Sequence, residues 1–111
     1  MIDWIRVADL RSEVGEDDFL EVIELFLEEV EEVTFRLKTA PDPERYEDDL
    51  HFLKGSALNL GFRDLGALCQ TGEKLAASGQ TDQISIPDVI ACYLLSKQEF
   101  LATVHNKSQA A

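Results

Sequence analysis

Apolar residues recur every three or four positions along most of this chain, which is the period of a helix buried along one side. The clearest case is the segment from about 16 to 38. Its apolar residues repeat with this spacing on one face of the predicted helix: Phe19, Val22, Ile23, Phe26, Val30, Val33 and Leu37. No segment of useful length alternates with the two-residue period of a strand. The pattern therefore predicts an all-α protein.

The same period predicts four further helices, at about 3–14, 43–60, 62–78 and 85–105. Glycine and proline mark the boundaries, notably at Gly15, Pro41, Gly61 and Gly79. Short connections make consecutive helices antiparallel neighbours. We therefore predict an antiparallel up-down-up-down four-helix bundle with a short additional N-terminal helix. It should form a single domain over residues 1–111, with its core at about 3–105 and a flexible tail at 106–111.

Charge narrows the range of partners. The chain has 22 acidic and 10 basic residues, a formal net charge of −12, so nucleic acid and anionic membrane surfaces should repel it. No apolar run reaches the roughly 18 residues that a membrane span needs. The first residues lack the basic start and long apolar stretch of a signal peptide. We expect a cytoplasmic protein that binds neither nucleic acid nor membrane.

The cysteines do not indicate a metal or a catalytic thiol. Cys69 and Cys92 lie on apolar helix faces, where buried reduced thiols are favoured over a disulfide in a cytoplasmic protein. The chain contains no CxxC or HExxH spacing, and neither cysteine has a discernible triad partner. We expect no bound metal and no cofactor.

The predicted helix at 43–60 carries the most informative pattern. Its buried face should consist of Tyr46, Leu50, Leu53, Ala57 and Leu60. His51 falls on the opposite side, with Gly55 beside it one turn later and Lys54 on its flank. The spacing therefore predicts an imidazole that faces solvent, next to a position without side-chain bulk and a positive charge.

This arrangement suits phosphoryl chemistry. Imidazole, with an unperturbed pKa of about 6.5, is nucleophilic and largely neutral at pH 7. An exposed His51 can attack a phosphoryl group brought by another molecule, and the Lys54 ammonium can offset the charge on the transferring oxygens. Glycine inside a helix costs about 1 kcal/mol relative to alanine, a cost that close approach of another molecule at Gly55 would explain.

The pattern His51-x-x-Lys54-Gly55-Ser56-Ala57-x-x-Leu60-Gly61 resembles the signature of histidine-containing phosphotransfer (HPt) domains, the relay modules of two-component phosphorelays. The resemblance extends from about Val7 to about Leu101. Leu50 departs from it, since a smaller residue is expected before the histidine. In that family the histidine carries the phosphoryl group, the lysine lies beside it, and the glycine leaves room for the incoming receiver domain.

The resemblance implies a function in two-component signal transduction. His51, through Nε2, would accept a phosphoryl group from the phospho-aspartate of one receiver domain and pass it to an aspartate of another. Lys54 would stabilise the phosphoryl charge, and Gly55 would provide clearance. The receiver would bring Mg²⁺. The expected partners are response-regulator receivers, a hybrid sensor kinase or both, with this protein a monomer.

Three further residues are candidates for contact with the partner. Phe52 and Leu58 flank His51 and are the docking candidates that the resemblance implies, although each could instead pack against a neighbouring helix. Ser56 could touch a phosphoryl oxygen or bond to the backbone of its own helix.

Two other functions are alternatives to the relay. The phosphoacceptor segment of a sensor kinase usually has an acidic residue directly after the histidine and a proline soon afterwards. Here Phe52 follows His51, no proline comes before Pro87, and the chain has no glycine-rich nucleotide loop. We expect no autonomous ATP-dependent kinase activity. A non-catalytic helical adaptor that binds receiver domains without phosphotransfer stays open, although it would not need the nucleophile.

Overall fold

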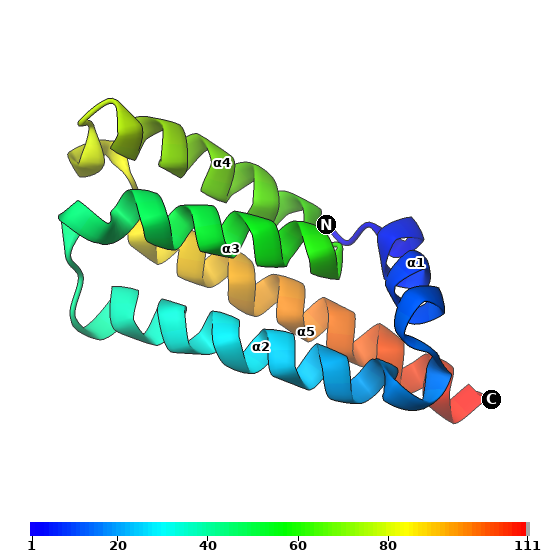
Figure 1. Ribbon diagram of the computed structural model, residues 1–111. Coiled ribbons are helices and arrows are strands. Elements are labelled where there is room, and N and C mark those ends of the chain that lie inside the picture. Colours follow the sequence, from blue (N-terminus) through cyan, green and yellow to red (C-terminus); the bar gives the residue numbers. More distant parts are fainter. Residues whose placement is uncertain (111) are drawn as a thin grey trace.

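Five α-helices and two short 3₁₀ helices make up the computed structural model, which describes residues 1–110 and the side chains of 1–104 (Figure 1). The α-helices are α1 (Trp4–Val14), α2 (Glu16–Thr39), α3 (Tyr46–Leu60), α4 (Arg63–Ala77) and α5 (Ile86–Ala110). The 3₁₀ helices span Pro43–Arg45 and Thr81–Gln83. The prediction of an all-α protein is confirmed. Over the described part of the chain, no helix has the length and apolar character that a membrane crossing requires.

The four long helices α2 to α5 lie side by side, and α1 crosses one end of the group (Figure 1). α3 packs most extensively against α4, and also against α2, while α5 packs against both α2 and α4. α1 contacts the ends of α2 and α3. Each long helix therefore buries one side against its neighbours, and α3 has a face left over for solvent.

The core follows the predicted apolar faces closely in α3 and less closely in α2. All five residues of the predicted face of α3 are buried. On α2, Val22, Phe26 and Val33 are only partly buried, whereas Leu27 and Thr34 are buried instead. The buried face is thus rotated toward the side that α5 covers. Thr34 fits there because its hydroxyl donates a hydrogen bond to the Glu31 carbonyl oxygen at 3.2 Å.

The predicted helix boundaries need two corrections. The predicted helix at 43–60 starts as the separate 3₁₀ turn at Pro43, where Asp42 accepts a hydrogen bond from the Glu44 amide. The last helix was expected to end at about His105 but continues to Ala110. The sequence also predicts a flexible tail at 106–111. The side chains of these residues, and residue 111 as a whole, lie outside the described part of the structure.

Gly61 ends α3 in the left-handed conformation that its position predicts, with φ of 79°. Its carbonyl oxygen accepts a hydrogen bond from the Asp3 amide at 2.7 Å, and an isolated antiparallel bridge joins Ile2 to Phe62. A Cβ at Gly61 would come within 2.7 Å of the Asp3 carbonyl oxygen. The start of the chain is therefore held against the turn between α3 and α4.

Both cysteines are free thiols, as the sequence favours. Burial raises the pKa of Cys69 to about 12 and also raises the pKa of Cys92. Both groups are therefore protonated at neutral pH, so neither supplies the reactive thiolate of a cysteine enzyme.

Candidate functional site

His51 projects from the open face of α3. Its side chain is 73% exposed, whereas Leu50 and Leu53, on the other side of the helix, are completely buried. This contrast follows from the helical period, because a residue placed opposite the packed face has no neighbour to cover it. The expected solvent-facing imidazole is present.

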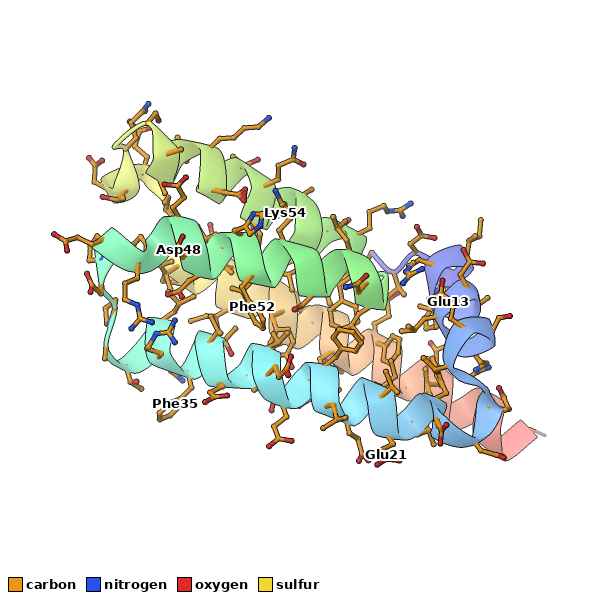
Figure 2. All side chains as sticks on the ribbon, viewed as in Figure 1. Glu13, Glu21, Phe35, Asp48, Phe52 and Lys54 are labelled. Carbon is orange, nitrogen blue, oxygen red and sulfur yellow. The ribbon has the colours of Figure 1, made fainter. Side chains whose placement is uncertain are left out.

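A carboxylate on α4 contacts both charged candidates of α3. The Nδ1 atom of His51 lies 3.0 Å from Oε2 of Glu73, and the Lys54 ammonium donates a hydrogen bond to Oε1 of Glu73 at 2.9 Å. Figure 2 shows Lys54 at the border between α3 and α4, where these contacts form. His51 and Lys54 are thus joined through one acidic side chain.

The charge on Glu73 determines which ring nitrogen of His51 is free. Hydrogen bonds from Lys54 and His51 hold the pKa of the Glu73 carboxyl below its usual range, against a smaller opposing effect of burial. Glu73 is therefore ionised at neutral pH and can only accept hydrogen bonds. In the neutral imidazole the proton must then be on Nδ1, which leaves the lone pair on Nε2.

Gly55 leaves an open position next to the imidazole. It is exposed, and a Cβ built there would meet nothing within 4 Å. Gly61, Gly66 and Gly72, by contrast, each face an atom closer than 3.0 Å. The packing of the protein itself therefore does not require glycine at position 55.

The apolar docking candidates lie on opposite flanks of His51. Phe52 is 37% exposed and lies on the side of α3 that faces α2 (Figure 2). Leu58 is 54% exposed and extends over α4, where a Cβ at Gly66 would come within 2.9 Å of it. Each side chain is partly packed and partly exposed, and its contact with a receiver domain stays a prediction.

Ser56 is the least exposed of the three docking candidates. It is only 7% exposed, and its hydroxyl has no hydrogen bond among the described side chains that would link it to His51 or Lys54. Its side chain is largely buried, and its contact with a partner stays a prediction.

An ion pair between α2 and α3 holds the first half of α3 in place. Arg36 of α2 donates a hydrogen bond to Asp49, which is buried. A buried carboxylate is tolerated when a cation compensates its charge. Because Asp49 lies two residues before His51, this pair helps set the rotation of α3 that exposes the imidazole.

Glu73 is the site residue that sequence reasoning missed. It belongs to a different helix, in the segment 62–78, where the apolar pattern predicts only a packing face. A signal was available, because α3 and α4 are joined by the tight turn at Gly61. His51 and Glu73 lie at comparable distances along the chain from that turn, and such residues become neighbours when two helices fold back on each other.

The comparisons with known proteins support this description. The family model of the Hpt domain matches residues 21–104, which run from α2 to α5 and include His51. The chain therefore belongs to the Hpt domain family, whose members transfer phosphoryl groups through histidine in two-component phosphorelays and interact with receiver domains and kinases. Searches of curated proteins and of solved structures gave no match.

Proposed function

We propose that this protein is a phosphorelay intermediate that accepts a phosphoryl group on Nε2 of His51 and passes it to a second receiver domain. The observation that carries the proposal is an exposed imidazole whose Nδ1 is bound to Glu73 while Nε2 faces solvent without a partner among the described residues. A nucleophile that reacts with a group held by another protein needs this combination of orientation and access.

The transfer uses the lone pair of Nε2. In the proposed step this pair attacks the phosphorus of an aspartyl phosphate on the donor receiver, the phosphorus–oxygen bond breaks, and the aspartate carboxylate leaves. The ring becomes a phosphorylated imidazolium whose Nδ1 proton stays in the hydrogen bond to Glu73, which stabilises the new positive charge. Lys54 supplies positive charge toward the phosphoryl oxygens. Transfer to the acceptor receiver is the same step in reverse.

The receiver approaches over the open position at Gly55. Phe52 and Leu58, which remain partly exposed on either side of His51, provide the apolar contacts of the docking surface. The Mg²⁺ ion is carried by the receiver, where it neutralises phosphoryl charge. A hybrid sensor kinase that contains a receiver domain is a partner of the same kind.

The proposal also covers the helix arrangement, the oligomeric state and the cellular location of the protein. The contacts of α2 with α3, α3 with α4, α4 with α5 and α5 with α2 support an antiparallel up-down-up-down bundle that keeps α3 rigid. The net charge of −12 supports a monomer, since two copies repel each other. Free thiols at Cys69 and Cys92 support a cytoplasmic location.

The first experiment follows the phosphoryl group itself. The protein is incubated with radiolabelled phospho-receiver domains and Mg²⁺, and the label on it is tested for stability in acid and base. We expect acid-labile, base-stable label, as a phosphorylated ring nitrogen gives. Receivers that bind tightly without ever transferring label would instead establish the adaptor function.

Removing the Glu73 carboxylate should slow the transfer. In Glu73→Ala both His51 and Lys54 lose their shared acceptor, and we expect phosphoryl acceptance to fall about tenfold, the effect of one charge-assisted hydrogen bond at a partly exposed site. Nitrogen NMR of the His51 ring should show that the tautomer with the lone pair on Nε2 no longer dominates. Glu73→Gln, whose amide oxygen can still accept from Nδ1, is the matched control and should retain more activity. Equal rates in all three proteins would contradict the positioning role.

Substitutions at Gly55 should separate stability from docking. Because a Cβ there meets nothing within 4 Å, Gly55→Ala should raise the free energy of unfolding by about 1 kcal/mol through helix propensity alone. Gly55→Gln should also keep the fold, but its longer side chain would occupy the space used by the receiver and weaken receiver binding.

Urea unfolding and titration with a receiver domain check the two effects at Gly55. If Gly55→Gln bound receivers as tightly as the unchanged protein, the proposed clearance would be wrong.

A further inference from the structure

Glu73 contacts the ring nitrogen of His51 that does not take part in the proposed attack. Nδ1 of His51 lies 3.0 Å from one carboxylate oxygen of Glu73 and 3.3 Å from the other. The Glu73 side chain is only 18% exposed, so water screens this contact less than it screens a pair on the open surface. An anion fixed at this distance favours the protonated, positively charged form of the ring.

The proton on Nδ1 decides how readily a phosphorylated ring releases its phosphoryl group. When the nitrogen–phosphorus bond breaks, its electron pair returns to Nε2. A ring with a proton on Nδ1 then leaves as neutral imidazole, whereas a ring without that proton has to leave as an anion, which is a much poorer leaving group. A ring with the unperturbed pKa of about 6.5 is mostly deprotonated at pH 7 and above.

We propose that Glu73 keeps the phosphorylated ring of His51 protonated at neutral and mildly alkaline pH, so that the loaded protein stays able to donate its phosphoryl group. This inference rests on the proposed function and concerns its second half, the transfer to an acceptor aspartate. In that step the Nδ1 proton stays on the ring, the nitrogen–phosphorus bond breaks, and a bond forms between the phosphorus and an aspartate oxygen. Glu73 acts through the ring and is therefore a positioning residue.

The charged groups of α3 differ in how they meet this ring. Lys54 donates a hydrogen bond to Oε1 of Glu73 at 2.9 Å, and its positive charge opposes the protonated ring. Glu47 and Asp48 lie one turn before His51 on α3 (Figure 2), but both are exposed and neither forms a hydrogen bond or an ion pair with the ring. The protonation of the ring therefore depends mainly on Glu73 and Lys54.

Charged groups of the other elements packed on α3 are engaged elsewhere or exposed. Arg36 of α2 is bound to Asp49, on the packed side of α3. Arg6 of α1 donates a hydrogen bond to a backbone carbonyl oxygen near the end of α3. Lys74 of α4 is exposed. Among the described side chains, no hydrogen bond or ion pair joins His51 to α1, α2 or the 3₁₀ turn before α3.

The test is a titration of the loaded protein between about pH 6 and pH 9. The full chain, labelled with nitrogen-15 in histidine, is phosphorylated with phosphoramidate, so that loading depends on no receiver domain. Nitrogen–phosphorus coupling identifies phosphorylated rings in the NMR spectrum, and loss of the signal in His51→Gln assigns it. The shift of Nδ1 then reports its proton. In Glu73→Gln, which keeps the size of the side chain but not its charge, the midpoint should fall by about one pH unit. An unchanged midpoint would overturn the proposal.

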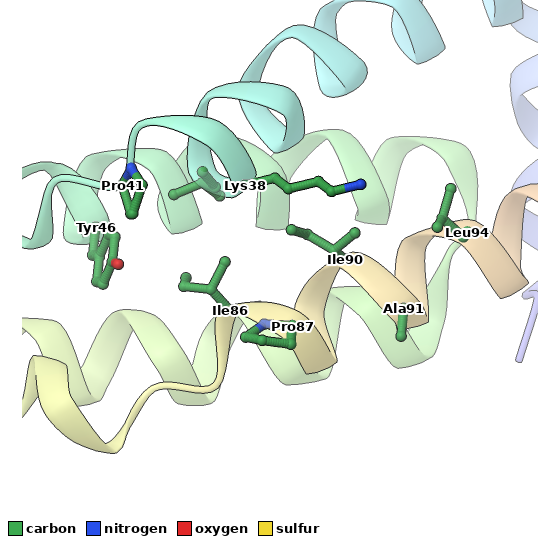
Figure 3. Close-up of a pocket in the computed structure, with 9 residues that line it drawn as sticks. Lys38, Pro41, Tyr46, Ile86, Pro87, Ile90, Ala91 and Leu94 are labelled. Carbon is green, nitrogen blue, oxygen red and sulfur yellow. The ribbon is translucent and has the colours of Figure 1, made fainter.

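Three further variants separate the charge of Glu73 from a general disturbance of the site. Lys54→Gln should move the midpoint of the ring upward, because the carboxylate is then no longer shared. Asp48→Asn removes an exposed carboxylate one turn from His51 and should have little effect. Lys38→Gln removes a lysine from the wall of an apolar groove of about 480 Å³ at the ends of α2 and α5 (Figure 3), and should have none. A midpoint that falls in Lys54→Gln as well would contradict the proposal.

Transfer to an acceptor receiver with Mg²⁺ gives the functional measurement. At each pH the rate of Glu73→Gln is divided by that of the unchanged protein, which removes the pH dependence of the receiver. This ratio should fall as the pH rises, by about tenfold across the titration. The same ratio at every pH would mean that Glu73 only orients the ring, and would overturn the inference. If no receiver took the group although the ring titrated as expected, the relay function would be wrong while the role of Glu73 in holding the proton would stand.

Discussion

Replacing His51 by Gln should abolish phosphoryl acceptance. Glutamine is similar in length to histidine but has no ring nitrogen with a nucleophilic lone pair, so the rate of labelling by a phosphorylated receiver should fall about a thousandfold or more. The time course of label on the two proteins, measured with the same donor receiver and Mg²⁺, gives this ratio directly.

The fold and the docking surface serve as controls for His51→Gln. Because the His51 side chain is 73% exposed, the midpoint of thermal unfolding should stay within a few degrees of that of the unchanged protein. Receiver binding should be preserved, since Phe52 and Leu58 are untouched. Label that still accumulates on the variant would put the phosphoryl group on another residue and contradict the proposed site.

The second large effect concerns stability. Gly61→Ala should lower the free energy of unfolding by about 2–3 kcal/mol, because alanine is strained at φ of 79° and its Cβ would lie 2.7 Å from the Asp3 carbonyl oxygen. Relief of this contact requires the N-terminal segment to move away from the turn between α3 and α4. Urea unfolding followed by circular dichroism measures the loss.

Gly79 offers a matched control. Its φ of 78° is nearly the same as that of Gly61, but a Cβ there meets nothing within 4 Å. Gly79→Ala should therefore cost only the backbone strain, about 1 kcal/mol. The difference between the two variants isolates the contact with Asp3. Equal losses of stability in the two variants would mean that the N-terminal segment moves away from position 61 without a cost in free energy.

The sequence predicted what depends on one helix at a time. The helical period alone put Leu50, Leu53 and Leu60 in the core and His51 outside it, because the two sets lie on opposite sides of α3. The left-handed end of α3 also followed from local chemistry, since Gly61 is the residue type that tolerates positive φ. The resemblance to HPt domains added the chemical meaning of the exposed histidine, and the match to the family model confirms that membership.

What the sequence did not predict depends on how helices meet. Glu73 reaches His51 only because α4 folds back along α3, and its sequence neighbours carry no mark of that contact. Leu27 and Thr34 are buried, whereas the predicted core residues Val22, Phe26 and Val33 are only partly buried. This difference depends on where α5 packs on α2. The bridge between Ile2 and Phe62 joins segments far apart in the chain, and no local sequence pattern predicted it.

The sharing of one carboxylate by two donors has a consequence for the charge balance of the relay. Before transfer, a neutral His51, the Lys54 cation and the Glu73 anion sum to zero. Under the proposed mechanism the phosphoryl group adds about two negative charges and the imidazolium one positive charge, so the loaded site has a net charge of about −1. That excess falls beside a carboxylate on an already acidic chain. If His51 carries the phosphoryl group as proposed, the phosphohistidine would be held in a repulsive field that favours onward delivery over storage.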